Sequence, residues 1–165
     1  MKEDDPTSGA FGEYALLKGV LSLPVPDHVG DLEAATIPVG VSFIDQAMYH
    51  TMMLPFPPLH FESPDPNGPA ILIYGDATAT GMFGLQYARL SGWRVVTTCS
   101  PHNFELVKAL GAHEGFDHVS GKACAAAIRT ATDNDLLYAL DCVSEGSSLE
   151  ICADALTSRS NVAWI

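Results

Sequence analysis

AILIYGDATATG (residues 70–81) joins an apolar run to a glycine-containing turn, and the next residues predict a helix that ends at Gly92. In a parallel sheet, such a turn lies at the carboxyl end of a strand, where doubly wound α/β proteins bind their ligands. Asp76 is the unexpected residue here, because a carboxylate and a pyrophosphate repel each other. The turn is therefore either a dinucleotide-binding loop or one with another use.

The rhythm of this stretch continues to residue 165. Apolar runs alternate with helical segments of about ten residues, several of them stopped by glycine. This alternation predicts right-handed βαβ units on a parallel sheet, and hence an α/β, doubly wound fold of about five strands. The predicted strands are 70–75, 93–100, 115–119, 136–143 and 161–165, and the predicted helices are 80–92, 103–112, 121–132 and 147–157.

Residues before 70 have a different pattern. Residues 10–26 predict two short strands around Lys18 and Gly19, punctuated by proline. Residues 55–69 contain six prolines and predict a loop or linker. We therefore expect three parts: 1–30, a helical segment with its linker at 31–69, and the α/β domain at 70–165.

The helical segment spans residues 31–53. Asp31 is a candidate cap for its first helix. Pro38 and Gly40 predict a break, after which a second helix begins at about Ser42.

Composition excludes several classes of protein. The chain has 165 residues, 47% hydrophobic and 17% charged, with a net charge of −12. This charge argues against nucleic acids and anionic membrane surfaces as partners. The start, MKEDDPTSG, has no signal-peptide core, and no apolar run is long enough to span a bilayer. The four cysteines lack metal-ligand spacing, so we expect reduced thiols, no metal site and a cytoplasmic protein.

Several residues suit a dinucleotide. Gly75 permits a tight turn, and Thr78 and Thr80 offer hydroxyl donors at a helix N-terminus. No acidic residue follows the second strand before Glu105, and the polar residues there are Ser100 and Asn103. An acid at this place would bind a ribose 2′-hydroxyl, whereas polar groups suit a 2′-phosphate, so NADPH is favoured over NADH. Other interpretations remain open: strict GxGxxG spacing is absent, many α/β proteins have such a turn without a nucleotide, and Ser100 or Asn103 could simply cap a helix.

Three motifs resemble one known family. YGDATATG (74–81), TCSPHNFELVKALGA (98–112) and YALDC (138–142) resemble the cofactor domain of fungal trans-acting enoyl reductases. These enzymes belong to the medium-chain dehydrogenase/reductase superfamily and reduce polyketide-synthase intermediates with NADPH. The resemblance implies a Rossmann-like domain lacking its last strand, preceded by a remnant of a GroES-like catalytic domain. It also implies cofactor contacts from Gly75, Thr78, Ala79, Thr80, Ser100, Asn103, His118, Cys142 and Val143.

The chain also departs from that family's pattern. Family members are about twice as long, and they usually have a small residue where Asp76 stands. Phe43 and Asp45 stand on a helix that normally carries small residues beside the nicotinamide. An acid near a phosphate costs about 1 to 4 kcal/mol, which argues against tight NADPH binding.

Three functions follow from these departures. The first is non-redox chemistry on a polyketide-type intermediate, either a cyclisation, pericyclic reactions included, or an isomerisation. Its candidate catalytic residues are Asp45, Asp76, Tyr49 and His50, and its candidate pocket residues are Phe43, Met52 and Met53. The second is NADPH-dependent enoyl reduction by a fragment or a chain completed by a partner. The third is a non-catalytic partner subunit of a polyketide synthase. For Asp45 and Asp76, a solvated helix face and a helix cap are equally simple interpretations.

Association is a separate expectation. Residues 10–26 would expose an apolar face, and the strand at 161–165 would be an edge. We therefore expect a homodimer formed through one or both elements.

Overall fold

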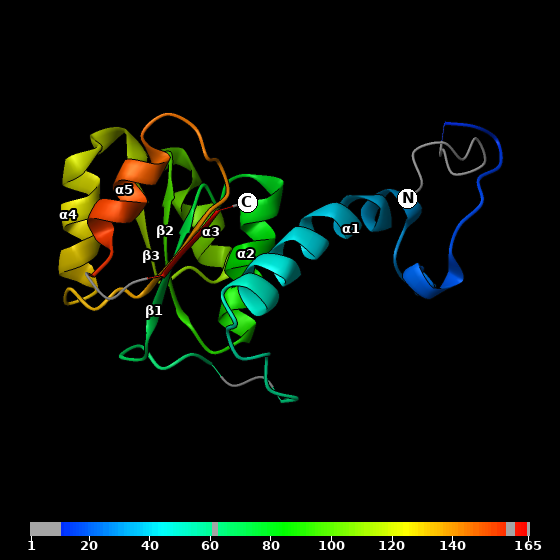
Figure 1. Ribbon diagram of the computed structural model, residues 1–165, viewed down its shortest axis with the longest axis horizontal. Helices are drawn as coiled ribbons and strands as arrows, with labels where there is room; N and C mark the ends of the chain where they lie inside the picture. Colours follow the sequence, from blue (N-terminus) through cyan, green and yellow to red (C-terminus); the bar gives the residue numbers. More distant parts are fainter. Residues whose placement is uncertain (1–10, 61–62, 158–160, 165) are drawn as a thin grey trace. The chain divides into compact units, whose positions relative to one another are not determined.

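The structure is a computed structural model that describes residues 11–60, 63–157 and 161–164. The chain divides into two units, residues 1–36 and 37–165, and the boundary falls within helix α1 (Asp31–Asp45). The second unit contains a five-stranded parallel sheet in the order β3-β2-β1-β4-β5 (Figure 1). Because the strand order reverses between β1 and β4, the fold is doubly wound, as predicted.

Every strand and helix predicted beyond residue 70 is present. The strands are β1 (Ala70–Tyr74), β2 (Arg94–Cys99), β3 (Glu114–Asp117), β4 (Tyr138–Asp141) and β5 (Asn161–Trp164). The helices are α2 (Ala79–Leu90), α3 (Phe104–Leu110), α4 (Lys122–Ala131) and α5 (Ser148–Ala155). Short 3-10 turns η3 (Pro101–Asn103) and η4 (His118–Ser120) follow β2 and β3.

The central strand β1 is buried on both faces. Ile71 and Ile73 belong to one apolar cluster with residues of α2 and α3, and Leu72 and Tyr74 belong to a second with residues of α4 and α5. Figure 1 shows these two pairs of helices on opposite faces of the sheet. Burial on both faces explains why β1 reads as a continuous apolar run rather than an alternating one.

The predicted break at Pro38 and Gly40 is wrong. Helix α1 continues through Pro38, and the π-helical turn η2 (Gln46–Thr51) follows it. A proline within a helix removes one backbone hydrogen bond, here the one from residue 38 to the carbonyl of residue 34, and α1 is nevertheless continuous. A Cβ on Gly40 would lie 2.5 Å from Cδ2 of Phe83. This glycine therefore permits close packing against α2 and does not end a helix.

The cap of α1 also differs from the prediction. Asp31 is the first helical residue, and Gly30 precedes it. The Gly30 carbonyl accepts from the Ala34 amide at 2.9 Å, and its own N–H donates to the Glu33 carboxylate at 3.1 Å. Gly30 therefore occupies the cap position, with Glu33 folding back onto it.

The predicted strands within residues 10–26 are absent among the described residues 11–26, where the only regular element is the 3-10 turn η1 (Gly19–Leu21). Apolar side chains of this segment, such as Leu16 and Leu23, are exposed. A strand needs a neighbour for its backbone groups, and no strand pairs with this segment in the described part of the chain. Residues 55–60 and 63–69 form no helix or strand, as predicted.

None of the described helices is long and apolar enough to cross a membrane. Strand β5 lies at one edge of the sheet and β3 at the other.

Candidate functional site

A cleft of about 410 Å³ lies at the carboxyl ends of the strands. It spans the point between β1 and β4 where the strand order reverses, which is where doubly wound proteins bind ligands. Its walls come from the ends of β1 and β2, from the turn after β3, and from the loop between β4 and α5. The lining residues are Tyr74, Gly75, Ala77, Thr78, Thr98, Cys99, Ser100, Asn103, His118, Val143, Glu145, Gly146 and Ser147.

The turn between β1 and α2 is held by its own polar groups. The Thr78 hydroxyl donates to the Gly75 carbonyl at 2.8 Å and accepts from the Gly81 amide at 3.0 Å. Gly75 has φ +79°, and a Cβ there would lie 2.3 Å from Cγ2 of Val143, so only glycine suits this position. The first turn of α2 follows directly, and backbone N–H groups at a helix N-terminus suit an anion, although the Gly81 amide is already bonded to Thr78.

Asp76 does not line the cleft. Its side chain is fully buried, and neither carboxylate oxygen has a hydrogen-bond partner. The neighbouring Thr97 hydroxyl donates instead to the Ile73 carbonyl at 2.7 Å. Burial raises the pKa of Asp76 to about 6. Since Thr78 caps α2, Asp76 is not the helix cap that the sequence allowed.

The ends of β2 and β3 supply neutral or basic polar groups. Ser100, Asn103 and His118 line the cleft together, as predicted. Neither Ser100 nor Asn103 caps a helix through its side chain, so both side chains are available to a ligand. Asp117 precedes His118, and its carboxylate accepts from the Val119 amide at 3.0 Å.

The loop after β4 completes the cleft through Asp141. This carboxylate is fully buried, and its Oδ1 accepts from the amides of Val143 and Ser144, both at 2.9 Å. These two bonds fix Val143 at the cleft, where the sequence predicted it. Three further lining residues, Glu145–Ser147, were not predicted from the sequence, although they lie just after a predicted strand at the ligand-binding end of the sheet.

Three predicted cofactor residues lie outside the cleft wall. Ala79 and Thr80 are in the first turn of α2, and Cys142 packs against the apolar cluster on the α2 side of the sheet. Burial raises the pKa of the Cys142 thiol to about 12. It is therefore a protonated packing residue at neutral pH.

The residues predicted for non-redox catalysis are not gathered in one site. Tyr49 is buried in the core, where its hydroxyl lies 2.7 Å from Oγ of Ser91 and its ring stacks on Phe56 at 4.5 Å. Asp45 and His50 are exposed. None of the three lines the cleft at the switch point.

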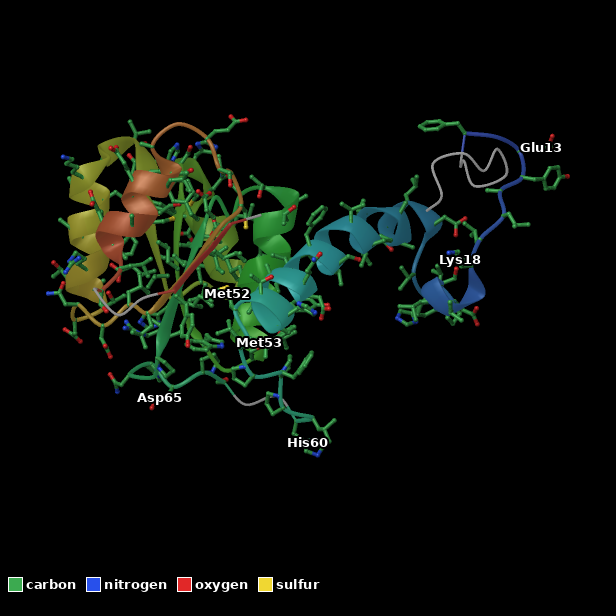
Figure 2. All side chains as sticks on the ribbon, in the orientation of Figure 1. Glu13, Lys18, Met52, Met53, His60 and Asp65 are labelled. Atoms are coloured by element: carbon green, nitrogen blue, oxygen red, sulfur yellow. The ribbon has the colours of Figure 1, made fainter. Side chains whose placement is uncertain are left out.

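The predicted apolar pocket is likewise dispersed. Phe43 and Met53 are exposed by 49% and 78%, whereas Met52 is buried. Met52 and Met53 are adjacent in sequence just beyond η2 (Figure 2). Their opposite exposures show that they do not form one shared wall.

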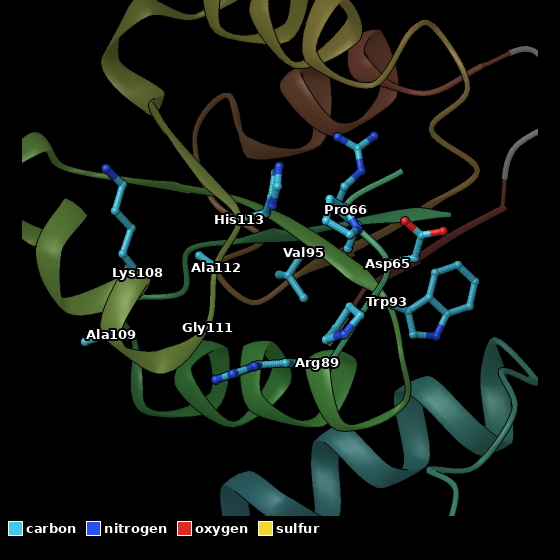
Figure 3. A pocket seen from close by; sticks show the side chains of 12 residues that line it. Asp65, Pro66, Arg89, Trp93, Val95, Lys108, Ala109, Gly111, Ala112 and His113 are labelled. Atoms are coloured by element: carbon cyan, nitrogen blue, oxygen red, sulfur yellow. The ribbon is translucent and has the colours of Figure 1, made fainter. Parts of the chain in front are cut away.

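A second cleft, of about 370 Å³, lies near the amino end of β2. It contains Arg89, Lys108 and His113, and also the acidic side chain of Asp65. In Figure 3, Lys108 and His113 extend away from Arg89, so these basic groups do not converge on one point. The residues described by the structure include no group of three or more His, Cys, Asp or Glu side chains that could hold a metal ion. The cleft at the switch point is therefore the better candidate.

The parallel doubly wound sheet, with its glycine turn leading into α2 at the switch point, defines a Rossmann-like α/β domain. Residues 79–165 match the family described as "Zinc-binding dehydrogenase", and this match covers more than half of the chain. The chain therefore belongs to that family.

Individual proteins resemble the chain over most of its length. It is 42% identical over 151 residues to trans-enoyl reductase ACTTS2 of Alternaria alternata, covering 92% of this chain and 43% of that protein. It is 40% identical over 164 residues to trans-enoyl reductase resD of Aspergillus sclerotiorum, covering 93% and 46%. The chain thus spans less than half the length of these relatives.

Solved structures share the fold. CurK enoyl reductase matches with a TM-score of 0.70 at 20% identity, over 86% of this chain and 39% of that one. Mycobacterial Rv1454c, solved in complex with NADPH, matches with the same TM-score and identity over 86% and 40%. At this level of identity, both comparisons support the fold alone.

Proposed function

We propose that this chain is the cofactor-binding part of a trans-acting enoyl reductase and that the cleft at the switch point binds NADPH. The observation that carries the proposal is the composition of that cleft. Among the described residues, its polar side chains at the β2 and β3 ends are Thr98, Ser100, Asn103 and His118, none of which is acidic. The acid that lines the cleft, Glu145, lies instead on the loop after β4. This set suits a 2′-phosphate better than a ribose 2′-hydroxyl. The names of the fungal relatives support the same activity.

Each wall of the cleft has a place in this proposal. The Gly75–Thr80 turn and the first turn of α2 would hold the pyrophosphate through backbone N–H groups. Ser100, Asn103 and His118 would hold the 2′-phosphate through hydrogen bonds from their side chains. Val143, fixed by Asp141, would lie near the nicotinamide ribose. Bound NADPH supplies a hydride for reduction of a carbon–carbon double bond, here in a polyketide-type substrate carried by a polyketide synthase.

Non-redox cyclisation or isomerisation is the alternative chemistry. It would require several of Asp45, Asp76, Tyr49 and His50 to act on one substrate. Two of these side chains are exposed and two are buried in different surroundings, Tyr49 against Phe56 and Asp76 beneath the β1–α2 turn. The cleft geometry therefore favours the reductase proposal.

Nicotinamide fluorescence tests cofactor binding directly, with NADPH and NADH titrated into the purified chain. We expect NADPH to bind more tightly than NADH by about tenfold, corresponding to about 1.4 kcal/mol. The double variant Ser100→Ala, Asn103→Ala should lose most of this preference by weakening NADPH binding alone. Ser147→Ala, on the opposite wall of the cleft, is the matched control and should leave the preference unchanged.

Two results would contradict the proposal. Equal weakening of NADPH and NADH by the double variant would move the 2′-phosphate away from Ser100 and Asn103. Absence of saturable binding of either nucleotide would remove the reductase proposal and favour cyclisation assays on polyketide intermediates.

Self-association is proposed on different evidence. Phe11, Leu16, Val20 and Leu23 are exposed by 74% or more, and apolar side chains that are close in sequence favour burial against a partner. We propose that this segment pairs with a second copy of the chain. Light scattering should give a dimer at micromolar concentration, and a monomeric mass would exclude it.

A further inference from the structure

Asp76 is a fully buried carboxylate with no cationic partner among the described residues. Its side chain is 0% exposed, and both oxygens lack hydrogen-bond partners. Burial of an ionised carboxylate without a partner is strongly unfavourable, so such groups favour the protonated form. In agreement, burial raises the pKa of Asp76 to about 6.

The groups around Asp76 come from β2, α2 and the residue after β4. On β2, the Thr97 hydroxyl donates to the Ile73 carbonyl at 2.7 Å. Its proximity and that of the Asp76 backbone N–H lower the pKa of Asp76, but by less than burial raises it. The titratable neighbours are the thiols of Cys99 and Cys142. Burial raises the pKa of Cys99 to about 11, reinforced by the Asp76 charge, and that of Cys142 to about 12, reinforced by the charges of Asp141 and Asp76. Both thiols are protonated and neutral near neutral pH, so neither pairs with an ionised Asp76.

The α2 side is closed by backbone. A Cβ on Gly81 would lie 2.5 Å from the Asp76 Cα and 2.4 Å from the Gly75 carbonyl oxygen. The turn therefore lies directly against the first turn of α2, with little room for Asp76 to swing out. Its carboxylate is held beneath the backbone that would face the pyrophosphate.

We propose that dinucleotide binding in the cleft is coupled to protonation of Asp76, so that the protein takes up a proton as the pyrophosphate binds. This inference rests on the proposed function. An anionic pyrophosphate over an ionised Asp76 would be repelled at short range, whereas over a protonated Asp76 it would not. Since ligand affinity and proton affinity are linked, the bound state must raise the affinity of Asp76 for its proton.

The coupling has a defined direction. Above the pKa of the free protein, binding must first protonate Asp76, and the dissociation constant rises with pH. Between about pH 5.5 and about pH 8 we expect the wild type to lose about tenfold to 100-fold in affinity relative to Asp76→Asn. The asparagine is nearly isosteric and cannot ionise, so this contribution vanishes in the variant.

The experiment is calorimetric titration with NADP⁺ across this pH range, in two buffers of different ionisation enthalpy. The 2′-phosphate also titrates in this range, but it does so with both proteins, so only the difference between wild type and Asp76→Asn counts. Near pH 7 the wild type should take up about half a proton to one proton more than the variant. Asp154→Asn, which removes an exposed carboxylate on α5, is the charge-matched control and should behave as wild type.

A second measurement needs no variant. Carboxyl ¹³C NMR should place the midpoint of Asp76 near pH 6 in the free protein, and NADP⁺ should move it upward. Binding with the same pH dependence in wild type and Asp76→Asn would overturn the coupling while leaving the cofactor site intact. Absence of binding by both proteins at every pH would instead overturn the proposed function, and the coupling with it.

Discussion

Two turns at the carboxyl ends of the strands each contain a buried aspartate, but only one of them provides hydrogen-bond donors for it. Asp76 follows β1 and Asp141 ends β4, and both side chains are fully buried. Asp141 accepts two backbone N–H groups from its own loop, at 2.9 Å each, whereas Asp76 accepts none. The same residue type is therefore a structural cap in one turn and an uncompensated charge in the other.

The backbone that follows each aspartate explains the difference. After Asp141 the chain turns back at once, with Ser144 at φ 54°, and this brings two amides onto the carboxylate. After Asp76 the hydroxyl and the amide of Thr78 both donate to the Gly75 carbonyl, so neither donor reaches the Asp76 carboxylate. A buried acid is thus stabilising only where the loop geometry supplies donors.

The largest expected effect is that of Asp141→Ala. Two backbone amides would lose their charged acceptor, which should lower the free energy of unfolding by about 3 to 4 kcal/mol. Urea unfolding measures this loss. Asp141→Asn keeps an acceptor oxygen and should cost much less, so equal losses in the two variants would show that the hydrogen bonds are not what Asp141 contributes.

Asp76→Asn should have the opposite sign and depend on pH. The pKa of Asp76 is raised from 3.8 to about 6 in the folded protein. A raised acid pKa favours folding below about pH 4, and this advantage is lost as the pH rises through about 6. At about pH 7.5 the variant should therefore be more stable than wild type by about 2 to 3 kcal/mol.

The control for this prediction is the same comparison of wild type and Asp76→Asn at low pH. At about pH 4 both carboxyl and amide are uncharged, so the stabilities of wild type and Asp76→Asn should converge. Thermal unfolding at the two pH values measures the difference. A constant gap at both would mean that Asp76 is not buried as a titrating group.

Thr78→Ala should have the smallest effect of the three. It removes the hydroxyl that caps α2 and braces the Gly75 carbonyl, at a cost of about 1 kcal/mol. Thr78→Ser keeps the hydroxyl and should be nearly neutral. Chemical unfolding compares the two, and a loss in the serine variant as large as in alanine would assign the effect to the methyl group.

The α/β half of the molecule was predictable from local pattern. The apolar run Ala70–Tyr74 is a strand buried on both faces, and Gly111, at φ 114°, ends α3 as its position indicated. Ser100, Asn103, His118 and Val143 meet in one cleft because parallel strands bring their carboxyl ends to one edge. The local sequence pattern sufficed here because each strand and helix is specified by its own residues, and the same strand–helix alternation repeats along the domain.

Other features depended on partners distant in sequence. Pro38 and Gly40 were predicted to break a helix, but the buried contact between Gly40 and Phe83 of α2 keeps it continuous. Residues 11–26 have a strand-like pattern but no neighbouring strand among the described residues. Tyr49 was predicted as a catalytic residue and Met52 as a pocket residue, but the surrounding side chains place both in the core.

By itself, the sequence determined the order of strands and helices, the position of the glycine turn and the lack of an acid before Glu105, because these depend on local composition and spacing. Only the tertiary structure decided the state of the two aspartates. A carboxylate's charge depends on the donors and the solvent around it. Two loop amides donate to Asp141, whereas Asp76 is enclosed without such donors, and both arrangements exist only when the sheet has formed.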